Sequence, residues 1–423
     1  MAQCQPAPVL DQFLPTTDSA TPRMADFYQN GPIATLHRLG DPDYELLESE
    51  LSAIAKIRPL TLVLPCHARD LHAPALAGII DELRAAQFIN HVIVGLDGAD
   101  ATTFVQAKSI FSKLPYPASI LWNDGPEISS LLRDLEGAGL DPGTMGKGRN
   151  LRLCIGHAIS STRPSAIAIH DCDIVNYRRQ MLVRLAFPVM HPDMGFRVAK
   201  GYSARFSSRL DGRVMRLLLT PLLKAMENLP GFEESPGPLR FFRYPISGEV
   251  CLSPSIASAL RFPSDWGVET GMMADLCRVC ELERVCQVDI AESYDHKHQA
   301  LSEADPSTGL NKMACDVALC LLRSLPSPLP KPEKSTLIDL LARYSDIATD
   351  LLRFYAADAR INLLDYDRDH EKRTIQLFAE SIRRAIELYA IEDQKPPPTP
   401  SWSDIESSIP GFGATLAKAV DRC

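Results

Sequence analysis

Short apolar runs and segments of helical periodicity alternate through the first half of the chain. The apolar runs are predicted to be buried strands because they are short and bounded by polar turns, and they lie at 60–65, 91–97, 118–124 and 166–169. The segments between them repeat apolar residues at helical spacing, at 74–88, 101–114 and 128–135. Strands that alternate with helices of about 10–15 residues are typical of βαβ units. The pattern therefore predicts an α/β fold with a mostly parallel sheet.

A polar turn follows each predicted strand at its carboxyl end. In chain order these turns read "PCHARD", "LDGAD", "WNDG" and "HDCD". The carboxyl ends of parallel strands meet at one edge of a sheet, and ligands of open α/β sheets bind at that edge. We therefore expect the four turns to line one site.

The segments before and after this region lack the alternation of strands and helices. Residues 1–55 read as a polar leader followed by a helix, with Asp41 as its expected N-cap. A stiff connector is formed by Pro326, Pro328, Pro330 and Pro332. Beyond it, apolar residues from Leu337 to Phe354 recur at helical spacing and are expected to share one face. The predicted divisions are a helical leader at 1–55, a large domain at 56–325 with halves 56–175 and 176–325, and a helical extension at 333–423.

Composition and charge narrow the classes of partner. The chain has 423 residues and a net charge of -9, with no extended basic patch, so we expect neither nucleic acid nor a membrane surface as a partner. Neither a signal peptide nor an apolar run long enough to span a bilayer is apparent. The 11 cysteines are expected to be reduced thiols of a cytoplasmic protein. Cys277 and Cys280 have a CxxC spacing but lie in a helical segment, which favours core packing over metal binding.

Two carboxylates two residues apart follow the fourth predicted strand. Asp171 and Asp173 would repel each other there unless something neutralises them. Both could reach one Mg²⁺ or Mn²⁺ ion, which accepts carboxylate oxygens together with substrate phosphates. The alternative is a solvated turn with a capping aspartate. His296 and His298 in "DHKHQ" could complete such a cation site, or could belong to a surface loop.

Two basic turns are candidates for binding phosphate or carboxylate groups. Lys147 lies in "GTMGKGRN", whose glycine spacing excludes a Walker A loop but suits contact with a diphosphate. Gly212 and Arg213 precede an apolar helix in "RLDGRVMRLLLTPLL", where an arginine fork could hold an anion. A plain helix-entry turn and a solvated helix face are the respective alternatives. Glu269 in "WGVE" is either a structural carboxylate or a catalytic one.

Several motifs appear in a fixed order and carry a family resemblance. They read "GKGRN", "HDCDIVNY", "GYSARFSSRLDGRVMRLLLTPLL", "RYPISGE", "DWGVETG" and "YDHKHQ". With these motifs the chain resembles the retaining GT-A glycosyltransferases of the glucosyl-3-phosphoglycerate synthase family, from about Leu60 to Gln299. The resemblance implies a GT-A fold, with 56–175 as the half that binds the nucleotide-sugar and 176–325 as the half that binds the acceptor.

The resemblance also implies a role for each matching residue. Asp173 and His296 would be the metal ligands. The donor would be bound by Pro65, Asp97, Gly98, Lys147 and Asp171. The acceptor would be bound by Gly212, Arg213, Met215 and His298. The catalytic groups would be Glu269, the peptide carbonyl of Ile246, which would face the anomeric carbon, and Lys147.

The implied reaction is metal-dependent transfer of glucose from UDP-glucose to 3-phosphoglycerate with retention of configuration. Relatives usually carry a threonine where this chain has Met215, which gives free glycerate more weight as the acceptor. ADP-glucose, GDP-glucose and GDP-mannose remain open as donors. A sugar-phosphate nucleotidyltransferase and a domain that only binds nucleotide are the alternatives from other classes. The helical extension is expected to pack on the catalytic domain or across a homodimer.

Overall fold

The structure is a computed structural model that describes most of the chain. The described residues are 29, 31–227, 229–232, 237–295, 308–325, 332–392 and 398–422. Within these ranges, no helix is both long and apolar enough to span a membrane.

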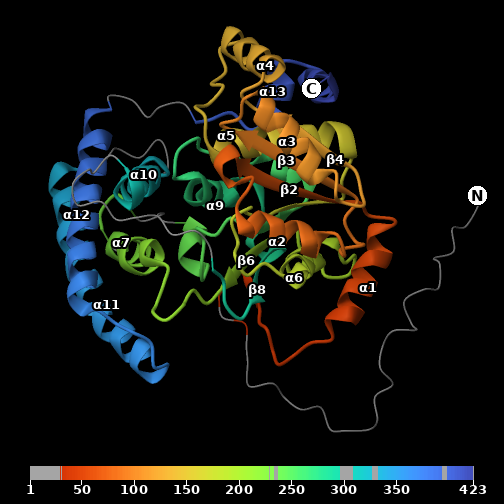
Figure 1. Cartoon of the computed structure of the whole chain (residues 1–423). Coiled ribbons are helices and arrows are strands. Elements are labelled where there is room, and N and C mark those ends of the chain that lie inside the picture. The colour runs from red at the N-terminus through yellow and green to blue at the C-terminus, as the bar shows by residue number, and fades with distance from the viewer. Residues whose placement is uncertain are drawn as a thin grey trace, which may run out of the picture.

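An eight-stranded sheet forms the centre of the molecule (Figure 1). Its strand order is β1-β8-β6-β7-β5-β2-β3-β4, and only β7 runs antiparallel to its neighbours. The strands are β1 (Ala34–Leu36), β2 (Leu60–His67), β3 (His91–Asp97), β4 (Ala118–Trp122), β5 (Ala166–Ile169), β6 (Val198–Ser203), β7 (Val250–Leu252) and β8 (Val285–Ala291). The predicted α/β fold with a mostly parallel sheet is confirmed.

Helices cover both faces of this sheet. Along β2, Leu62 and Leu64 point into one hydrophobic cluster while Val63 points into the other, as the two-residue period of a strand requires. The first cluster is covered by α1 (Tyr44–Ala55), α2 (Pro74–Leu83), α3 (Ala101–Phe111) and α6 (Arg179–Met190). The second is covered by α4 (Pro126–Gly137), α5 (Lys147–His157), α7 (Thr220–Met226), α8 (Pro254–Ala259) and α9 (Val268–Val279).

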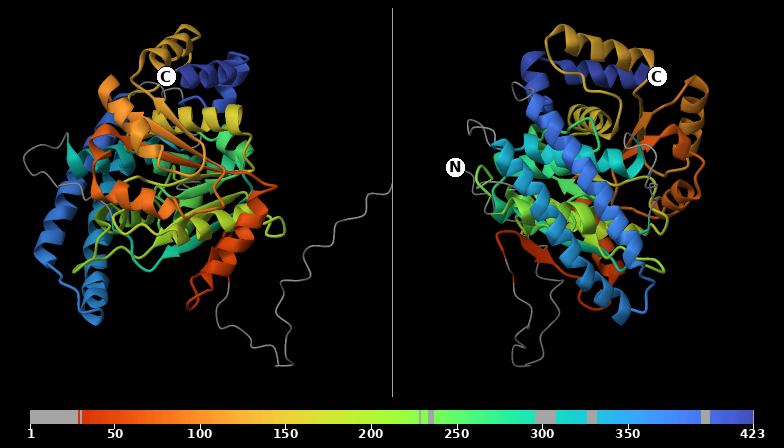
Figure 2. Two further views of the ribbon diagram at one scale, coloured as in Figure 1. Left: turned by 45° about the vertical axis from the view of Figure 1, so that its right-hand side comes forward. Right: turned by 90° about the vertical axis from the view of Figure 1, so that its left-hand side faces the viewer.

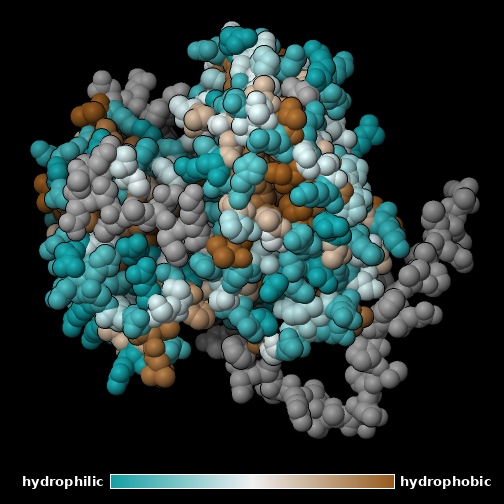
Figure 3. All heavy atoms as spheres, viewed as in Figure 1, coloured by the Kyte–Doolittle hydropathy of each residue, from teal (hydrophilic) through white to brown (hydrophobic). Residues whose placement is uncertain are grey.

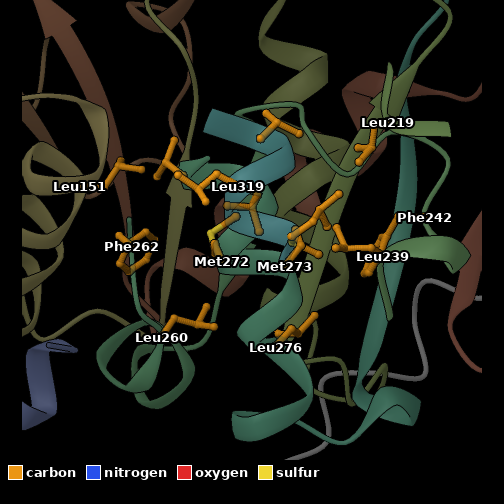
Figure 4. Packing of buried hydrophobic residues seen from close by; sticks show 14 of the residues in the cluster. Leu151, Leu219, Leu239, Phe242, Leu260, Phe262, Met272, Met273, Leu276 and Leu319 are labelled. Atoms are coloured by element: carbon orange, nitrogen blue, oxygen red, sulfur yellow. The ribbon is translucent and has the colours of Figure 1, made fainter. Parts of the chain in front are cut away.

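The C-terminal helices extend the second cluster. They are α10 (Gly309–Arg323), α11 (Lys334–Ile361), α12 (Arg368–Ile391), α13 (Trp402–Ser408) and α14 (Phe412–Arg422). Figure 4 shows Leu319 of α10 in this cluster with Leu151 of α5 and Met272 of α9. Both views of Figure 2 show α14 beside α4, far from the free end of the hairpin where α11 meets α12. The helical extension therefore shares one core with the sheet.

Three details differ from the sequence prediction. The side chain of Asp43, and not of Asp41, caps α1 by accepting a hydrogen bond from the Leu46 amide. Four strands were not predicted: β6, β7, β8 and the three-residue β1, which pairs with β8 at the sheet edge. Phe354 is 55% exposed, because the buried stripe of α11 runs through Leu337, Leu340, Tyr344, Ala348 and Leu352.

The surface is mostly hydrophilic in the view of Figure 3, with an apolar group at the free end of the α11–α12 hairpin. Ile361 and Leu363, which lie where α11 ends, are 81% and 87% exposed.

Candidate active site

The polar turns of four parallel strands lie along one edge of the sheet. β4, β3, β2 and β5 are consecutive neighbours, and His67 at the end of β2 is in register with Asp97 at the end of β3. The turn after β5 carries Asp171 and Asp173. The strand ends thus bring the predicted donor-binding turns to one edge.

Lys147 joins two carboxylates at this edge. Its Nζ contacts Asp171 Oδ1 and lies 2.7 Å from Glu269 Oε1. The three side chains come from the start of α5, the end of β5 and the first turn of α9. Burial works against the charge, yet the two carboxylates raise the pKa of Lys147 above its ordinary value. Lys147 is therefore an ammonium at neutral pH.

The glycine-rich turn before Lys147 is shorter than the sequence suggested. α5 begins at Lys147 itself, so the lysine belongs to the first helical turn. A Cβ on Gly148 would lie 1.8 Å from the carbonyl oxygen of Pro263. This glycine allows the helix start to pack against the 263–264 backbone, and that packing brings Lys147 to Glu269.

Asp173 lies in a negatively charged environment. Burial and the carboxylate of Asp171 raise the pKa of Asp173 to about 6, while Lys147 opposes the rise. Asp70 and Glu249 add further negative charge. Oxygen ligands with excess negative charge suit a hard divalent cation.

The described residues alone do not complete a metal site. They contain no group of three or more His, Cys, Asp or Glu side chains placed to hold a metal ion. His296 and His298 lie outside the described residues. The carboxylates of Asp171 and Asp173 are therefore the part of the predicted site that the structure places.

Asp97 and Gly98 form a hydrogen-bonded corner at the ends of β3 and β4. Asp97 is buried and accepts hydrogen bonds from the side-chain amides of Asn123 (2.9 Å) and Asn150 (3.1 Å). The Gly98 amide donates to Asp124 Oδ2 at 2.6 Å. Both oxygens of Asp97 are thus engaged inside the protein, so this carboxylate orients the corner.

Pro65 lies beside this corner, in β2. It is half-buried and in register with Gly95 of β3. Asn123, Asn150 and Asp124 were not among the predicted site residues, although "WNDG" and "GKGRN" contain them.

A tight loop, 246–249, closes against Asp171. A Cβ on Gly248 would lie 2.3 Å from Asp171 Oδ2, so only glycine fits there without displacement. The buried Lys200 Nζ donates to the carbonyls of Ser247 (2.6 Å) and Glu249 (3.3 Å). Burial lowers the pKa of Lys200 to about 8. The loop that carries Ile246 is therefore held from beneath by a buried cation, Lys200, which was not among the predicted site residues.

A buried arginine links this loop to the predicted acceptor turn. The guanidinium carbon of Arg205 lies 3.6 Å from the ring centroid of Tyr294 and 4.5 Å from that of Tyr244. Arg205 Nη2 is 3.8 Å from Glu249 Oε2, and the Tyr294 hydroxyl donates to Glu249 Oε1 at 2.5 Å. Glu249 is therefore a structural carboxylate.

The turn at Gly212 and Arg213 lies against Tyr244. A Cβ on Gly212, whose φ is +69°, would lie 3.0 Å from the Tyr244 hydroxyl. Arg213 Nη1 contacts His370 Nε2 of α12 at 3.1 Å. Met215 lies in a π-helix, Val214–Leu219, and packs against the second hydrophobic cluster. The structure thus places Lys147 in direct contact with both Asp171 and Glu269. Arg213 instead contacts His370 of the C-terminal extension.

Two curated proteins are similar to nearly the whole chain. Glucosyl-3-phosphoglycerate synthase from Persephonella marina is 35% identical over 399 residues, which cover 94% of this chain and 99% of the relative. The synthase of the same name from Methanococcoides burtonii is 32% identical over 401 residues, which cover 93% and 97%. The chain belongs to the glucosyl-3-phosphoglycerate synthase family. No model of a protein family matches the chain.

Solved structures of lower identity share the fold. Glucosyl-3-phosphoglycerate synthase from Mycobacterium tuberculosis, in complex with Mn²⁺, UDP and phosphoglyceric acid, is 22% identical with a TM-score of 0.51, covering 70% of this chain and 88% of its own. Mannosyl-3-phosphoglycerate synthase from Rubrobacter xylanophilus is 22% identical with a TM-score of 0.50, covering 71% and 86%. The predicted GT-A fold is confirmed.

Proposed function

We propose that the protein transfers glucose from UDP-glucose to 3-phosphoglycerate with retention of configuration, giving glucosyl-3-phosphoglycerate. The bridge from Lys147 to Asp171 and Glu269 carries the proposal, because it gathers three implied site residues at the ligand-binding edge of the sheet. Membership of the family supports this proposal. The same membership argues against a nucleotidyltransferase and against a protein that only binds nucleotide.

Carboxylates gather around Asp173 in the donor half of the site, and Lys147 pairs with one of them, Asp171. Asp173, together with His296, would hold a Mg²⁺ or Mn²⁺ ion, whose chemistry is Lewis-acid stabilisation of charge on the leaving nucleotide. The excess negative charge around Asp173 fits such an ion. Lys147 stays protonated, so it contributes positive charge toward the donor diphosphate and cannot serve as a general base. Asp171 contacts the donor ribose or sugar, and Pro65, Asp97 and Gly98 shape the pocket for the nucleoside.

The acceptor half centres on Gly212 and Arg213. The arginine guanidinium binds the anionic group of the acceptor and orients the hydroxyl that attacks. His298 lies near the acceptor in this proposal. Orientation by fixed groups lowers the barrier without a bond to the protein.

Retention follows if the acceptor attacks on the face from which the nucleotide leaves. A phosphate oxygen of the leaving nucleotide then accepts the hydroxyl proton, and the carbonyl of Ile246 faces the anomeric carbon. Glu269 is paired with Lys147 at 2.7 Å, which makes its carboxylate a poor nucleophile and favours a role in binding the sugar. A double displacement through Glu269 is the competing route.

Met215 favours a second candidate acceptor, free glycerate. Its thioether packs against the core and offers no hydroxyl to a phosphate. Arg213 could hold the glycerate carboxylate in the same way that it would hold a phosphate.

A matrix of donors and acceptors tests the proposal. UDP-glucose, ADP-glucose, GDP-glucose and GDP-mannose are each incubated with 3-phosphoglycerate or glycerate, with and without Mg²⁺. The proposal expects the highest kcat/KM for UDP-glucose with 3-phosphoglycerate, only with metal, and release of UDP. Release of pyrophosphate, or a preference for glycerate, would overturn it in its present form.

A further inference from the structure

The segment that follows the Gly212–Arg213 turn has an unusual backbone. Val214–Leu219 is a π-helix, a form that is rare and is frequently found at functional sites. Two of its carbonyl oxygens accept hydrogen bonds from tyrosine hydroxyls of α11, Tyr355 to Arg216 (3.1 Å) and Tyr344 to Leu217 (2.7 Å). The C-terminal extension thus satisfies backbone groups of the segment next to the turn.

Arg216 connects that turn to α12. Its guanidinium forms two hydrogen bonds of 2.8 Å with the carboxylate of Glu371, and the two side chains are only 13% and 9% exposed. The same guanidinium donates to the carbonyls of Asp211 (2.8 Å) and Leu210 (3.0 Å), which immediately precede Gly212. The conformation of the turn is therefore coupled to the position of Glu371.

The α11–α12 connection and the first turn of α12 each add one contact to residues 208–213. The Asp365 amide donates to the carbonyl of Ser208 at 2.8 Å. His370 Nε2 faces Arg213 Nη1 at 3.1 Å, and because arginine only donates, this nitrogen accepts. A cavity of about 220 Å³ lies between the two elements, lined by Arg209, Arg213, Tyr366 and His370 among others.

We infer that the α11–α12 hairpin is a positioning device for the acceptor turn, and that Glu371 is the positioning residue, acting through Arg216. The inference rests on the proposed function, in which this turn binds an anionic acceptor. A preorganised arginine turn loses less entropy when it binds its ligand, so loosening it weakens acceptor binding first. Donor binding, which in this proposal uses Lys147 and the turns at the strand ends, is expected to stay unchanged.

The chain provides a matched pair of variants. Glu371→Gln keeps the shape of the side chain but removes the charge that faces Arg216. Glu392→Gln makes the same change at the other end of α12, where Glu392 pairs with Arg323 of α10 at 2.5 Å. For Glu371→Gln we expect the KM for 3-phosphoglycerate to rise about tenfold and the KM for UDP-glucose to stay within about twofold. Glu392→Gln is expected to leave both KM values unchanged.

Two further variants keep the inference falsifiable if Glu371→Gln does not fold. Glu371→Asp keeps the charge on a shorter side chain and is expected to give an intermediate KM for the acceptor. Tyr355→Phe removes one hydrogen bond to the π-helix and is expected to raise the same KM by a smaller factor. An acceptor KM unchanged in every folded variant, or a donor KM raised equally, would overturn the inference. If the wild type does not use 3-phosphoglycerate or glycerate at all, the proposed function fails instead.

Discussion

At the scale of single residues, the two carboxylates after β5 are not equivalent. Asp171 is paired with Lys147, while Asp173 has a pKa raised to about 6 by burial and by its neighbour. The ammonium of Lys147 thus offsets the charge of Asp171. The charge of Asp173 has no such direct partner among the contacts described, and its carboxylate suits a cation.

Lys147→Met should remove the positive charge that faces the donor diphosphate. We expect kcat to fall by roughly 100-fold or more, as when one electrostatic contact to a developing charge is lost. Steady-state kinetics with UDP-glucose measure the loss. Lys312→Met breaks an exposed ion pair with Asp316 in α10 and serves as the control, with unchanged kcat. A kcat within twofold of wild type for Lys147→Met would remove this lysine from the site.

His157 should make the protein less stable in acid. Burial lowers the pKa of His157 to about 4, with His91 and Asp421 as its charged neighbours. Below its unfolded pKa of about 6.5 the unfolded chain binds a proton that the folded chain does not, so stability falls between pH 6.5 and about 4, by at most ~3 kcal/mol. Urea unfolding at several pH values measures the slope. His157→Gln should make the slope shallower without removing it, because burial also lowers the pKa of His170 to about 4. An identical slope in the variant would contradict the assignment.

Site residues could be predicted from the sequence where they belong to a short motif with a recognisable chemistry. Lys147, Asp171 and Glu269 were selected from short motifs, and the structure places them in contact. Lys200 and Arg205 were not selected, because their role depends on partners 47 and 44 residues away along the chain. A buried charge with a distant partner leaves no periodic signal in the sequence.

At the scale of elements, the loop at 246–249 is tightly constrained on two sides. Lys200 supports it from the sheet side, and Gly248 meets Asp171 on the other. The sequence predicted strands β2 to β5 and the helices between them, because burial and helical spacing are periodic there. It did not predict β1, β6, β7 or β8, or the π-helix Val214–Leu219, which has no sequence signature.

Gly248→Ala should push the loop away from Asp171. The added Cβ would lie 2.3 Å from Asp171 Oδ2, so either the loop or the carboxylate must move. We expect kcat/KM for UDP-glucose to fall by about 100-fold, the cost of a displacement of about 1 Å at a reacting centre. Gly78→Ala in α2 is the matched control, since a Cβ there meets no atom within 4 Å. Equal activity in the two variants would contradict this account of the loop.

At the scale of the whole molecule, the C-terminal extension is part of the core and contacts the predicted acceptor turn. Leu337, Tyr344 and Phe378 are buried in the same cluster as β-strand residues such as Val63. The predicted boundary at residue 333 therefore marks a change in the sequence pattern, while the residues on both sides of it share one hydrophobic core. The homodimer and the domain boundaries stay predictions.

A chain that ends at residue 332 should not fold. Removing the extension would expose the core residues that pack against the buried side chains of α11 and α12. Burial of each such side chain stabilises the fold by about 1.5–3 kcal/mol, and the total stability of a protein is typically about 5–15 kcal/mol. Circular dichroism and thermal unfolding of the truncated chain measure this. A cooperative transition near that of the full chain would show instead that the extension is a separate domain.

The central claim is retaining transfer of glucose to 3-phosphoglycerate at the edge that carries Asp173. The most direct measurement incubates the protein with UDP-glucose carrying carbon-13 in the sugar, 3-phosphoglycerate and Mg²⁺, and follows the anomeric carbon by NMR. The account predicts an α-linked glucosyl-3-phosphoglycerate with the wild type, and no product with a folded Asp173→Asn variant. A β-linked product, or full activity in Asp173→Asn, would contradict it.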